Sequence, residues 1–328
     1  MQFPVLASEY RLWAIVLASI LVHGTVFTLL HTFLSRTVFG ALYNKLTKRE
    51  QMRFDERMVA MLHACVSCQG SIRAFFSVLP HELTVKNIVF LSGAFAFVPL
   101  PPFQNAPQTH FTHTLDSHRE DHAKWELTET YLCITLGYFL YDTLIYLFVS
   151  RGHPFVDLMH HFVSEGQYII HIALRWGYFL PTCLQTNEIS TPFVHLSWFA
   201  AKAGEHGFTG FGRLFSPFQI TFGVLFLLSR ILFNTALFAV TCYTFYYYVF
   251  VVDTVPKYAI VVSFVNFCLY LVVQYFWFFA ILRKFVAILH GNASAAWGKN
   301  GATGAASQKN DKKADKKGDK KTDKKKTN

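Results

Sequence analysis

The chain has 328 residues, of which 52% are hydrophobic and 17% aromatic, and its formal net charge is +10. This composition and a mean hydropathy of +0.29 are too apolar for an ordinary soluble domain, so they predict a polytopic membrane protein. The charge is uneven, because residues 309–328 hold ten lysines and four aspartates. A surplus confined to one tail argues against a nucleic-acid partner and predicts a solvated tail beside a membrane.

The cysteines and the clustered histidines do not follow a metal-site pattern. The six cysteines lie in or near apolar segments, and the CxxC formed by Cys65 and Cys68 has no second pair, so we expect small buried residues. A histidine-rich stretch matches no strong zinc signature and is expected to be a solvated loop, with its imidazoles at His110, His113, His118 and His122. We therefore expect no bound metal and no resident cofactor.

Apolar segments of near bilayer-spanning length recur along the chain. About seven are expected to cross the membrane as helices: residues 13–34, 58–79, 131–149, 155–174, 176–201, 217–251 and 258–282. The fifth contains prolines and a polar centre at 185–191, so it should be interior and kinked or broken. The sixth has 35 residues and must tilt, kink or protrude. A shorter apolar stretch, 85–99, is expected to be interfacial or re-entrant. The predicted fold class is an all-α polytopic helical bundle.

The distribution of basic residues sets the expected topology. A basic loop at 35–57 follows the first span, so the positive-inside rule places it in the cytosol. Seven spans then place the loop at 202–213 and the C-terminus in the cytosol as well. The sequon at Asn292 would lie on that side and is expected to be unused. Lys325 and Lys326, fourth and third from the end, resemble a dilysine retrieval signal, which predicts an endoplasmic reticulum membrane protein recognised by coat-type retrieval machinery.

Polar residues in the fourth span follow a helical spacing. Positions three or four apart share a helix face, and this spacing separates Asp157, His161, Glu165 and Tyr168. His160 and His171 are eleven apart, close to three turns, and share a neighbouring face. A carboxylate four residues from a histidine can fix its tautomer and raise its basicity. Because ionisable groups are costly in membrane segments, this stripe is predicted to be a functional site.

Two charged residues in neighbouring spans extend this prediction. Asp142 and Arg230 are placed to face the same interior, where a polar chamber would hold a lipid head group or a thioester. Two alternatives stay open. Histidines in membrane helices often only hydrogen-bond between helices. Asp142 and Arg230 can also be each other's salt-bridge partner.

Five local patterns in order over roughly residues 50–285 resemble the TLC-domain family, which includes the ceramide synthases and TRAM-type translocon proteins. They are Arg57 to Ala64, Gly137 to Asp142, Met159 to His161, Glu188 to Phe199, and Arg230 with Ile231. The Glu188-Ile189-Ser190-Thr191-Pro192-Phe193 stretch with Trp198-Phe199 most resembles the TLC domain-containing protein 4 subgroup. The resemblance implies a helical bundle around a central lipid-accessible cavity. It also implies a division into residues 1–49 (first helix and basic loop), 50–285 (TLC domain) and 286–328 (disordered tail).

The resemblance also implies candidate roles. By likeness to ceramide synthases, His160 and His161 would be base or acyl-accepting groups, oriented by Asp157 or Glu165. Lipid-binding roles are expected for Asp142, Tyr168, His171, Glu188, Arg230 and His63. Ceramide synthases carry a His-Asp-x-Ser-Asp segment where this chain has Asn187-Glu188-Ile189-Ser190-Thr191, so one imidazole and one carboxylate are missing.

The first expectation is therefore an endoplasmic reticulum TLC-domain protein that binds lipid and acts in membrane lipid homeostasis. The first alternative is a ceramide synthase-like N-acyltransferase with acyl-CoA as co-substrate. The second is a translocon-associated or trafficking chaperone. The expected partners are membrane lipids and the bilayer, and homodimer formation is left open.

Overall fold

The computed structural model describes residues 3–78, 115–149, 155–174, 178–246, 249–250 and 257–289. Every regular element within these ranges is helical, which confirms the all-α prediction. The chain divides into two compact units, residues 1–274 and 275–328. The stretch 85–99, His110, His113, the sequon and the lysine-rich tail lie outside the described residues.

The N-terminal helices are longer than the apolar pattern alone predicts. Helix α1 (Phe3–Leu29) continues through a π-helical turn, Leu30–Leu34, into α2 (Ser35–Val38). After α3 (Gly40–Tyr43), helix α4 covers Lys48–Val78. The start of α4 is set by a capping box, because the Thr47 backbone N–H donates to Glu50 Oε2 at 2.9 Å and the Glu50 N–H donates to Thr47 Oγ1 at 3.3 Å.

The middle of the chain forms two long helices. Helix α6 covers Leu115–Leu144 and ends in a π-helical turn, Ile145–Val149. Helix α7 covers Phe155–Leu174, the range expected for the fourth span. His118 and His122 belong to α6, so the prediction of a loop was wrong for these two positions.

The fifth apolar segment is broken where its polar centre lies. Helix α8 (Phe179–Gln185) gives way to a 3₁₀ segment, Thr186–Ser190, and α9 (Thr191–Glu205) follows with proline in its first turn. Proline is tolerated there because the first N–H groups of a helix have no intrahelical partner. The predicted break is confirmed, and Asn187, Glu188 and Ser190 in it are buried.

The next apolar segment changes helix type without stopping. After α10 (Thr209–Gly212), α11 (Phe215–Leu225) leads into a π-helical stretch, Phe226–Phe233, and then α12 (Asn234–Tyr246). Helix α13 covers Lys257–Leu289. Side chains bond to the backbone across the π-helical stretch, since Ser229 Oγ donates to the Leu225 carbonyl at 2.7 Å and Thr235 Oγ1 to the Ile231 carbonyl at 2.6 Å.

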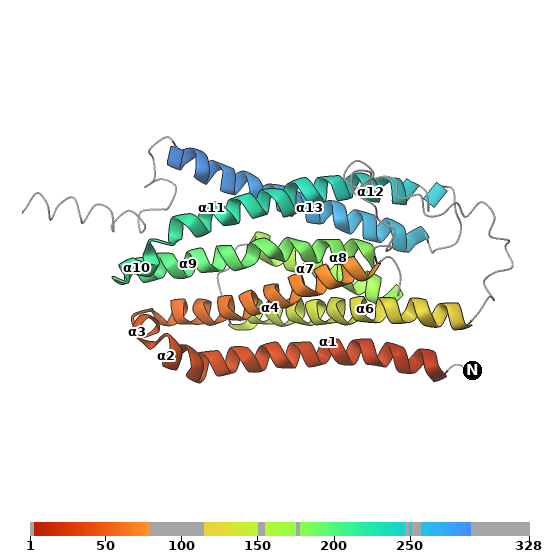
Figure 1. Cartoon of the computed structure of the whole chain (residues 1–328), viewed down its shortest axis with the longest axis horizontal. Coiled ribbons are helices and arrows are strands. Elements are labelled where there is room, and N and C mark those ends of the chain that lie inside the picture. Colours follow the sequence, from red (N-terminus) through yellow and green to blue (C-terminus); the bar gives the residue numbers. More distant parts are fainter. Residues whose placement is uncertain are drawn as a thin grey trace, which may run out of the picture. The chain divides into compact units, whose positions relative to one another are not determined.

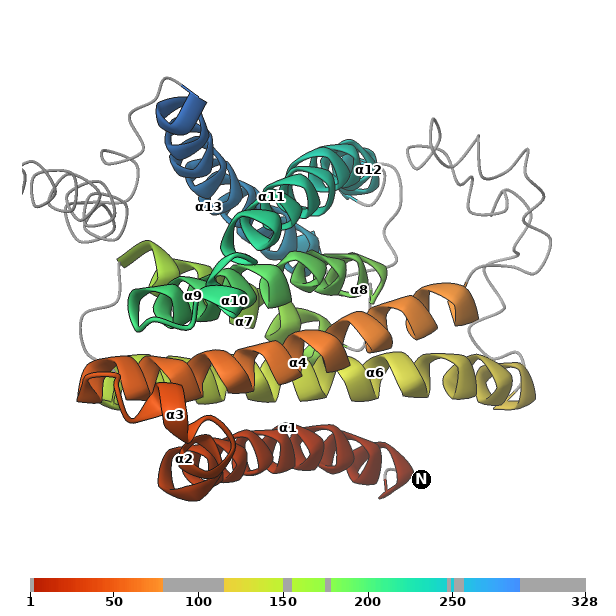
Figure 2. The same cartoon turned by 60° about the vertical axis from the view of Figure 1, so that its left-hand side comes forward.

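Within residues 1–274, the helices stack in layers. α1 lies along α6, α4 also packs on α6, and α11 packs on α9 (Figures 1 and 2). A glycine makes the first contact close, because a Cβ on Gly137 would lie 2.5 Å from Ser19 Cβ. The layer of α7, α8 and α9 lies between the α4–α6 pair and the α11–α12 segment. Its buried polar residues include His160, His161, Gln185 and Ser197.

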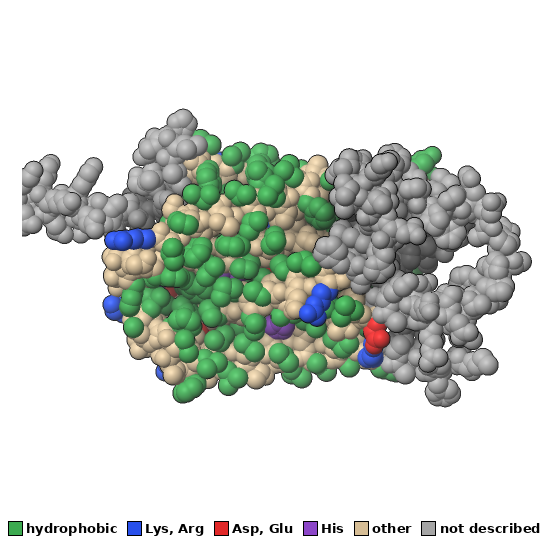
Figure 3. All heavy atoms as spheres, in the orientation of Figure 1, with side chains coloured by type: hydrophobic (Ala, Val, Ile, Leu, Met, Phe, Trp, Pro, Cys, Tyr) green, Lys and Arg blue, Asp and Glu red, His purple; other side chains and the backbone are tan. Residues whose placement is uncertain are grey.

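The described helices include four stretches long and apolar enough to cross a membrane: Tyr10–Val38, Glu126–Val149, Thr209–Ala239 and Lys257–Val286. The count of seven spans is therefore not confirmed. α8 and α9 have only 7 and 15 residues because the 3₁₀ segment separates them. Hydrophobic side chains dominate the face drawn in Figure 3, and few charged ones appear on it. These findings define a membrane protein built from helices.

Candidate functional site

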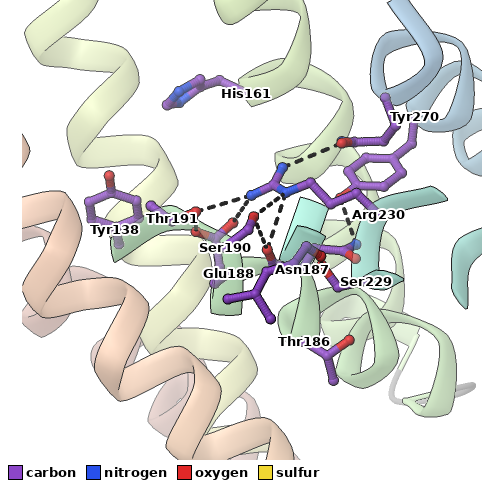
Figure 4. Close-up of polar contacts among 12 residues, drawn as sticks. Tyr138, His161, Thr186, Asn187, Glu188, Ser190, Thr191, Ser229, Arg230 and Tyr270 are labelled. Carbon is purple, nitrogen blue, oxygen red and sulfur yellow. Dashed lines mark hydrogen bonds and ion pairs between the residues drawn. The ribbon is translucent and has the colours of Figure 1, made fainter. Parts of the chain in front are cut away.

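Arg230 is the centre of the buried polar network. The π-helical stretch carries it, and only 6% of the residue is exposed. Its Nε donates to the Asn187 carbonyl and to Ser190 Oγ, both at 3.1 Å, and its Nη2 donates to Thr191 Oγ1 at 3.1 Å (Figure 4). Asn187 and Ser190 belong to the 3₁₀ segment between α8 and α9, and Thr191 is the first residue of α9. The broken helix therefore supplies oxygen atoms to a cation that could not stay buried without them.

Glu188 is the carboxylate partner of this cation. Its Oε1 lies 3.5 Å from Arg230 Nη2, and its Oε2 accepts a hydrogen bond from Thr191 Oγ1 at 2.7 Å. Gln274 of α13 adds a carbonyl oxygen 3.4 Å from Arg230 Nη1. A buried ion pair is stable when further hydrogen bonds satisfy its remaining donors and acceptors, and this pair meets that condition.

The network continues toward the histidines through Asn187 and Tyr270. Asn187 Nδ2 donates to Tyr270 Oη at 2.8 Å and to Asn234 Oδ1 at 3.4 Å. The ring of Tyr270 lies 5.8 Å from that of His160, measured between centroids. The Arg230 network and the paired histidines are thus parts of one interior region.

His161 is paired with a carboxylate from α6. His161 Nε2 lies 3.4 Å from Asp142 Oδ2, and Tyr138 Oη donates to that same oxygen at 3.4 Å. His160 and His161 meet edge to face with ring centroids 5.8 Å apart, and Phe139 contacts both rings. A buried imidazole held by a carboxylate is the arrangement of a general base with its orienting group.

The structure adds a partner that the helical spacing of α7 did not indicate. Asp142 forms an ion pair with His161, and Glu165 accepts from Thr143 Oγ1 at 2.5 Å. Asp157 is half-buried near the start of α7. Arg230 pairs with Glu188, so the alternative of an Asp142–Arg230 salt bridge was wrong. These contacts join side chains of different helical elements across the bundle.

Two further residues of α7 serve contacts between helices. His171 Nε2 lies 3.0 Å from Ser263 Oγ of α13, and Gln167 Nε2 donates to the same hydroxyl at 3.0 Å. Tyr168 stacks on Phe139 with centroids 5.8 Å apart. For His171 this geometry matches the alternative that a membrane histidine bonds neighbouring helices.

His63 lies beside Tyr138, which links it to the histidine pair. Its ring stacks on that of Tyr138 at 3.8 Å between centroids, with an interplanar angle of 9°. His23 of α1 meets it edge to face at 5.6 Å. Only 1% of His63 is exposed, and neither of its ring nitrogens has a hydrogen-bond partner in the described part of the chain.

Sequence reasoning missed several residues of the site: Tyr138, Asn187, Ser190, Thr191, Tyr270 and Gln274. They are neutral polar residues, which carry a weak signal in an apolar helix. The polar centre at 185–191 includes Asn187, Ser190 and Thr191, and the pattern from Gly137 to Asp142 includes Tyr138, but neither predicted a role for these residues. Among the described residues, no group of three or more histidine, cysteine, aspartate or glutamate side chains could hold a metal ion.

The fold and site define a helical membrane bundle with a buried ionic network beside paired histidines. The model of the TLC domain matches residues 53–283, and the chain belongs to the TLC-domain family. It is 32% identical over 176 residues to the TLC domain-containing protein L438 of Acanthamoeba polyphaga mimivirus, covering 50% of this chain and 76% of the viral protein. No solved structure matches the chain significantly. The assignment to the TLC domain-containing protein 4 subgroup has no support from these matches.

Proposed function

We propose that this protein is a multi-pass membrane protein of the endoplasmic reticulum that binds lipid within its helical bundle and acts in membrane lipid homeostasis. The observation that carries the proposal is the buried Arg230–Glu188 pair with its hydroxyl and amide contacts. Ionisable residues inside membrane bundles mark functional sites because their burial is costly. Such a network offers hydrogen bonds to a lipid head group, while the surrounding helices offer apolar surface to its chains.

Two segments that are not regular α-helix support a functional role for this network. Arg230 lies in a π-helical stretch, and such stretches occur frequently at functional sites. Its partners Asn187, Glu188 and Ser190 lie in the 3₁₀ segment that separates α8 from α9. Non-helical backbone at membrane depth is tolerated where protein buries it or where it lines a cavity. Both irregularities converge on the same guanidinium.

The location is proposed from the tail. Lys325 and Lys326 occupy the positions of a dilysine retrieval signal, provided that the C-terminus is cytosolic. The basic loops near α2–α3 and α10 favour that orientation.

The experiment removes both charges at once. Arg230→Gln with Glu188→Gln removes both charges together and leaves a polar amide at each position, so no buried charge is left without its partner and the bundle should fold. Lipids that co-purify in detergent are identified by mass spectrometry. We expect a defined lipid with the wild type and at least a tenfold loss in the double variant. Arg213→Gln, an exposed arginine outside the network, is the control. Equal lipid content in all three folded proteins would contradict the proposal.

A second candidate, acyl-CoA-dependent N-acyl transfer, is favoured by the 3.4 Å contact between His161 and Asp142. The amine nitrogen would form a bond to the thioester carbon, and the bond from that carbon to sulfur would break. His161 would take the amine proton and return it to the departing thiolate, while Asp142 stabilises the charged imidazole.

Acyl transfer is measured with the purified protein, a long-chain acyl-CoA and a panel of sphingoid amines. The His160→Ala/His161→Ala variant is assayed beside it. Turnover that the variant loses would establish the enzyme. An absence of turnover while lipid still co-purifies would favour the lipid-binding role.

A further inference from the structure

Arg57 of α4 occupies a junction of four helical elements. Its Nη1 donates to His195 Nδ1 of α9 at 3.0 Å, and its guanidinium carbon lies 5.0 Å from the ring centroid of Trp198, also of α9. It interacts electrostatically with Tyr146 in the π-helical turn after α6 and with Asp157 at the start of α7. An arginine stacked on tryptophan has its plane held in a defined orientation.

Glu56 and Asp157 act on the charge of Arg57 electrostatically and Arg53 opposes them, but no carboxylate within the described residues contacts the guanidinium. None of the ion pairs there, taken as nitrogen–oxygen distances up to 4.0 Å, includes Arg57. His195 must accept through Nδ1, since arginine only donates, so this imidazole is the neutral Nε2–H tautomer and carries no compensating charge. Arg57 is half-buried, and a guanidinium has five N–H donors, of which the hydrogen bond to His195 uses one. Arg57 therefore retains capacity for an anion.

The position of Arg57 links it to the histidine pair. Tyr146, its electrostatic neighbour, lies with its ring 4.8 Å from the ring of His161. Arg57 comes nine residues after the start of α4, about 14 Å along the helix axis. That end of residues 1–274 also carries α3, α10 and the end of α9, where the basic loops lie (Figure 1). A ligand with its anion here would extend from the basic end of the bundle toward the histidines.

We propose that Arg57, held by Trp198 and His195, binds the phosphate of an acylated ligand whose remaining part occupies the region of His161. The guanidinium fork matches two oxygens of one phosphate, and charge-assisted hydrogen bonds of this kind are about twice as strong as neutral ones. A phospholipid and an acyl-CoA share this chemistry. The inference rests on one part of the proposed function, namely that a lipid or acyl chain enters the helical bundle.

The test measures ligand affinity for the full chain in a phosphate-free detergent. The ligands are a phosphatidic acid, the diacylglycerol with the same chains, and a long-chain acyl-CoA. Arg57→Gln removes the charge, Arg57→Lys keeps the charge without the fork, and Arg213→Gln is the exposed control. We expect Arg57→Gln to weaken phosphate-bearing ligands about tenfold, equal to about 1.4 kcal/mol, and to leave diacylglycerol unchanged. Arg57→Lys should lie between, and Arg213→Gln should match the wild type.

The outcomes distinguish a phospholipid from an acyl-CoA as the ligand. They also distinguish failure of the Arg57 inference from failure of the proposed lipid-binding function. Loss for phosphatidic acid identifies a phospholipid, and loss for acyl-CoA identifies a thioester substrate. Equal loss for all three ligands would show that Arg57 only joins α4 to α9 and would overturn the inference. Binding of all ligands by Arg57→Gln within twofold of the wild type would also overturn it while lipid binding stands. Failure of every ligand to bind the wild type would overturn both.

Discussion

At the residue scale, the Arg230–Glu188 pair shows how an apolar bundle holds two opposite charges. The break before α9 turns two hydroxyls and a carbonyl toward the guanidinium, and Gln274 adds a fourth oxygen. Because each charge compensates the other, the cost of losing one differs from the cost of losing both.

We expect Glu188→Gln alone to destabilise the protein by about 3 kcal/mol, since it leaves a buried cation without its counter-charge. Arg230→Gln with Glu188→Gln should be less destabilised than the sum of the single variants. Unfolding in detergent, completed as a double-mutant cycle, measures this coupling. Additive effects would show that the two charges do not depend on each other.

His63 allows ring stacking and hydrogen bonding to be separated. His63→Phe preserves an aromatic ring against Tyr138 and removes two buried nitrogens, so we expect stability to stay equal or rise by about 1 kcal/mol. His63→Ala should lose about 2 kcal/mol or more, because a cavity replaces the ring. Melting temperatures compare the two variants. A His63→Phe variant as unstable as His63→Ala would mean that the nitrogens make a stabilising contact.

At the element scale, close helix contacts depend on single glycines. At Gly137 a Cβ would lie 2.5 Å from Ser19 Cβ and 2.6 Å from the Val16 carbonyl oxygen of α1. Backbone cannot yield as a flexible side chain does, so α1 would have to move away from α6.

Gly137→Ala is therefore expected to destabilise the protein by about 1–3 kcal/mol through overpacking. Gly24→Ala in α1 is the matched control, because its nearest neighbour would be Tyr141 Cδ2 at 4.0 Å and alanine favours helix. Thermal unfolding of both variants measures the difference in their stability. A neutral Gly137→Ala would mean that α1 shifts at little cost.

An ion pair joins the start of α4 to the end of α9. Burial raises the pKa of Glu50, but hydrogen bonds from Lys202, 2.7 Å away, and from Thr47 outweigh it and hold the pKa at about 2, below its ordinary 4.5. A carboxyl whose folded pKa is depressed stabilises the folded state fully above its unfolded pKa. This contribution is lost as the pH falls from 4.5 toward 2.

We expect the melting temperature of the wild type to fall more steeply than that of Lys202→Met over this pH range, because the variant lacks the cation that lowers the pKa. The difference should correspond to on the order of 1 kcal/mol, as for a partly exposed pair. Circular dichroism during heating provides the measurement. Parallel pH dependences would show that Lys202 does not stabilise the ionised Glu50.

At the scale of the whole molecule, the TLC domain is extended at both ends. The family match covers residues 53–283, so all of α1 and the lysine-rich tail lie outside it. α1 is nevertheless packed on α6 and contributes His23 to the rings around His63. The tail contains Lys325 and Lys326, which we propose to form a retrieval signal.

Under the proposed retrieval role, Lys325→Ala with Lys326→Ala is expected to shift the protein out of the endoplasmic reticulum without changing its lipid content, since both positions lie outside residues 53–283 of the family match. Fluorescence microscopy of tagged cells reports location, with the tag placed at the N-terminus so that the last residues stay free. Lys320→Ala with Lys321→Ala, elsewhere in the tail, is the control. Equal retention of both variants would contradict the retrieval role.

The sequence by itself determined the helical class, the bounds of α7 and the break between α8 and α9. Those features follow from local physics: apolar length, helical spacing, and proline beside polar residues each act over fewer than about 20 neighbours. Only the tertiary structure decided that Asp142 pairs with His161 and Glu188 with Arg230. Helical spacing shows which residues share a face, but it does not say which distant helix packs against that face. Glu188 and Arg230 are 42 residues apart in the sequence, and they are in contact because the 3₁₀ segment and the π-helical stretch lie side by side. No periodic pattern in the sequence predicts this contact.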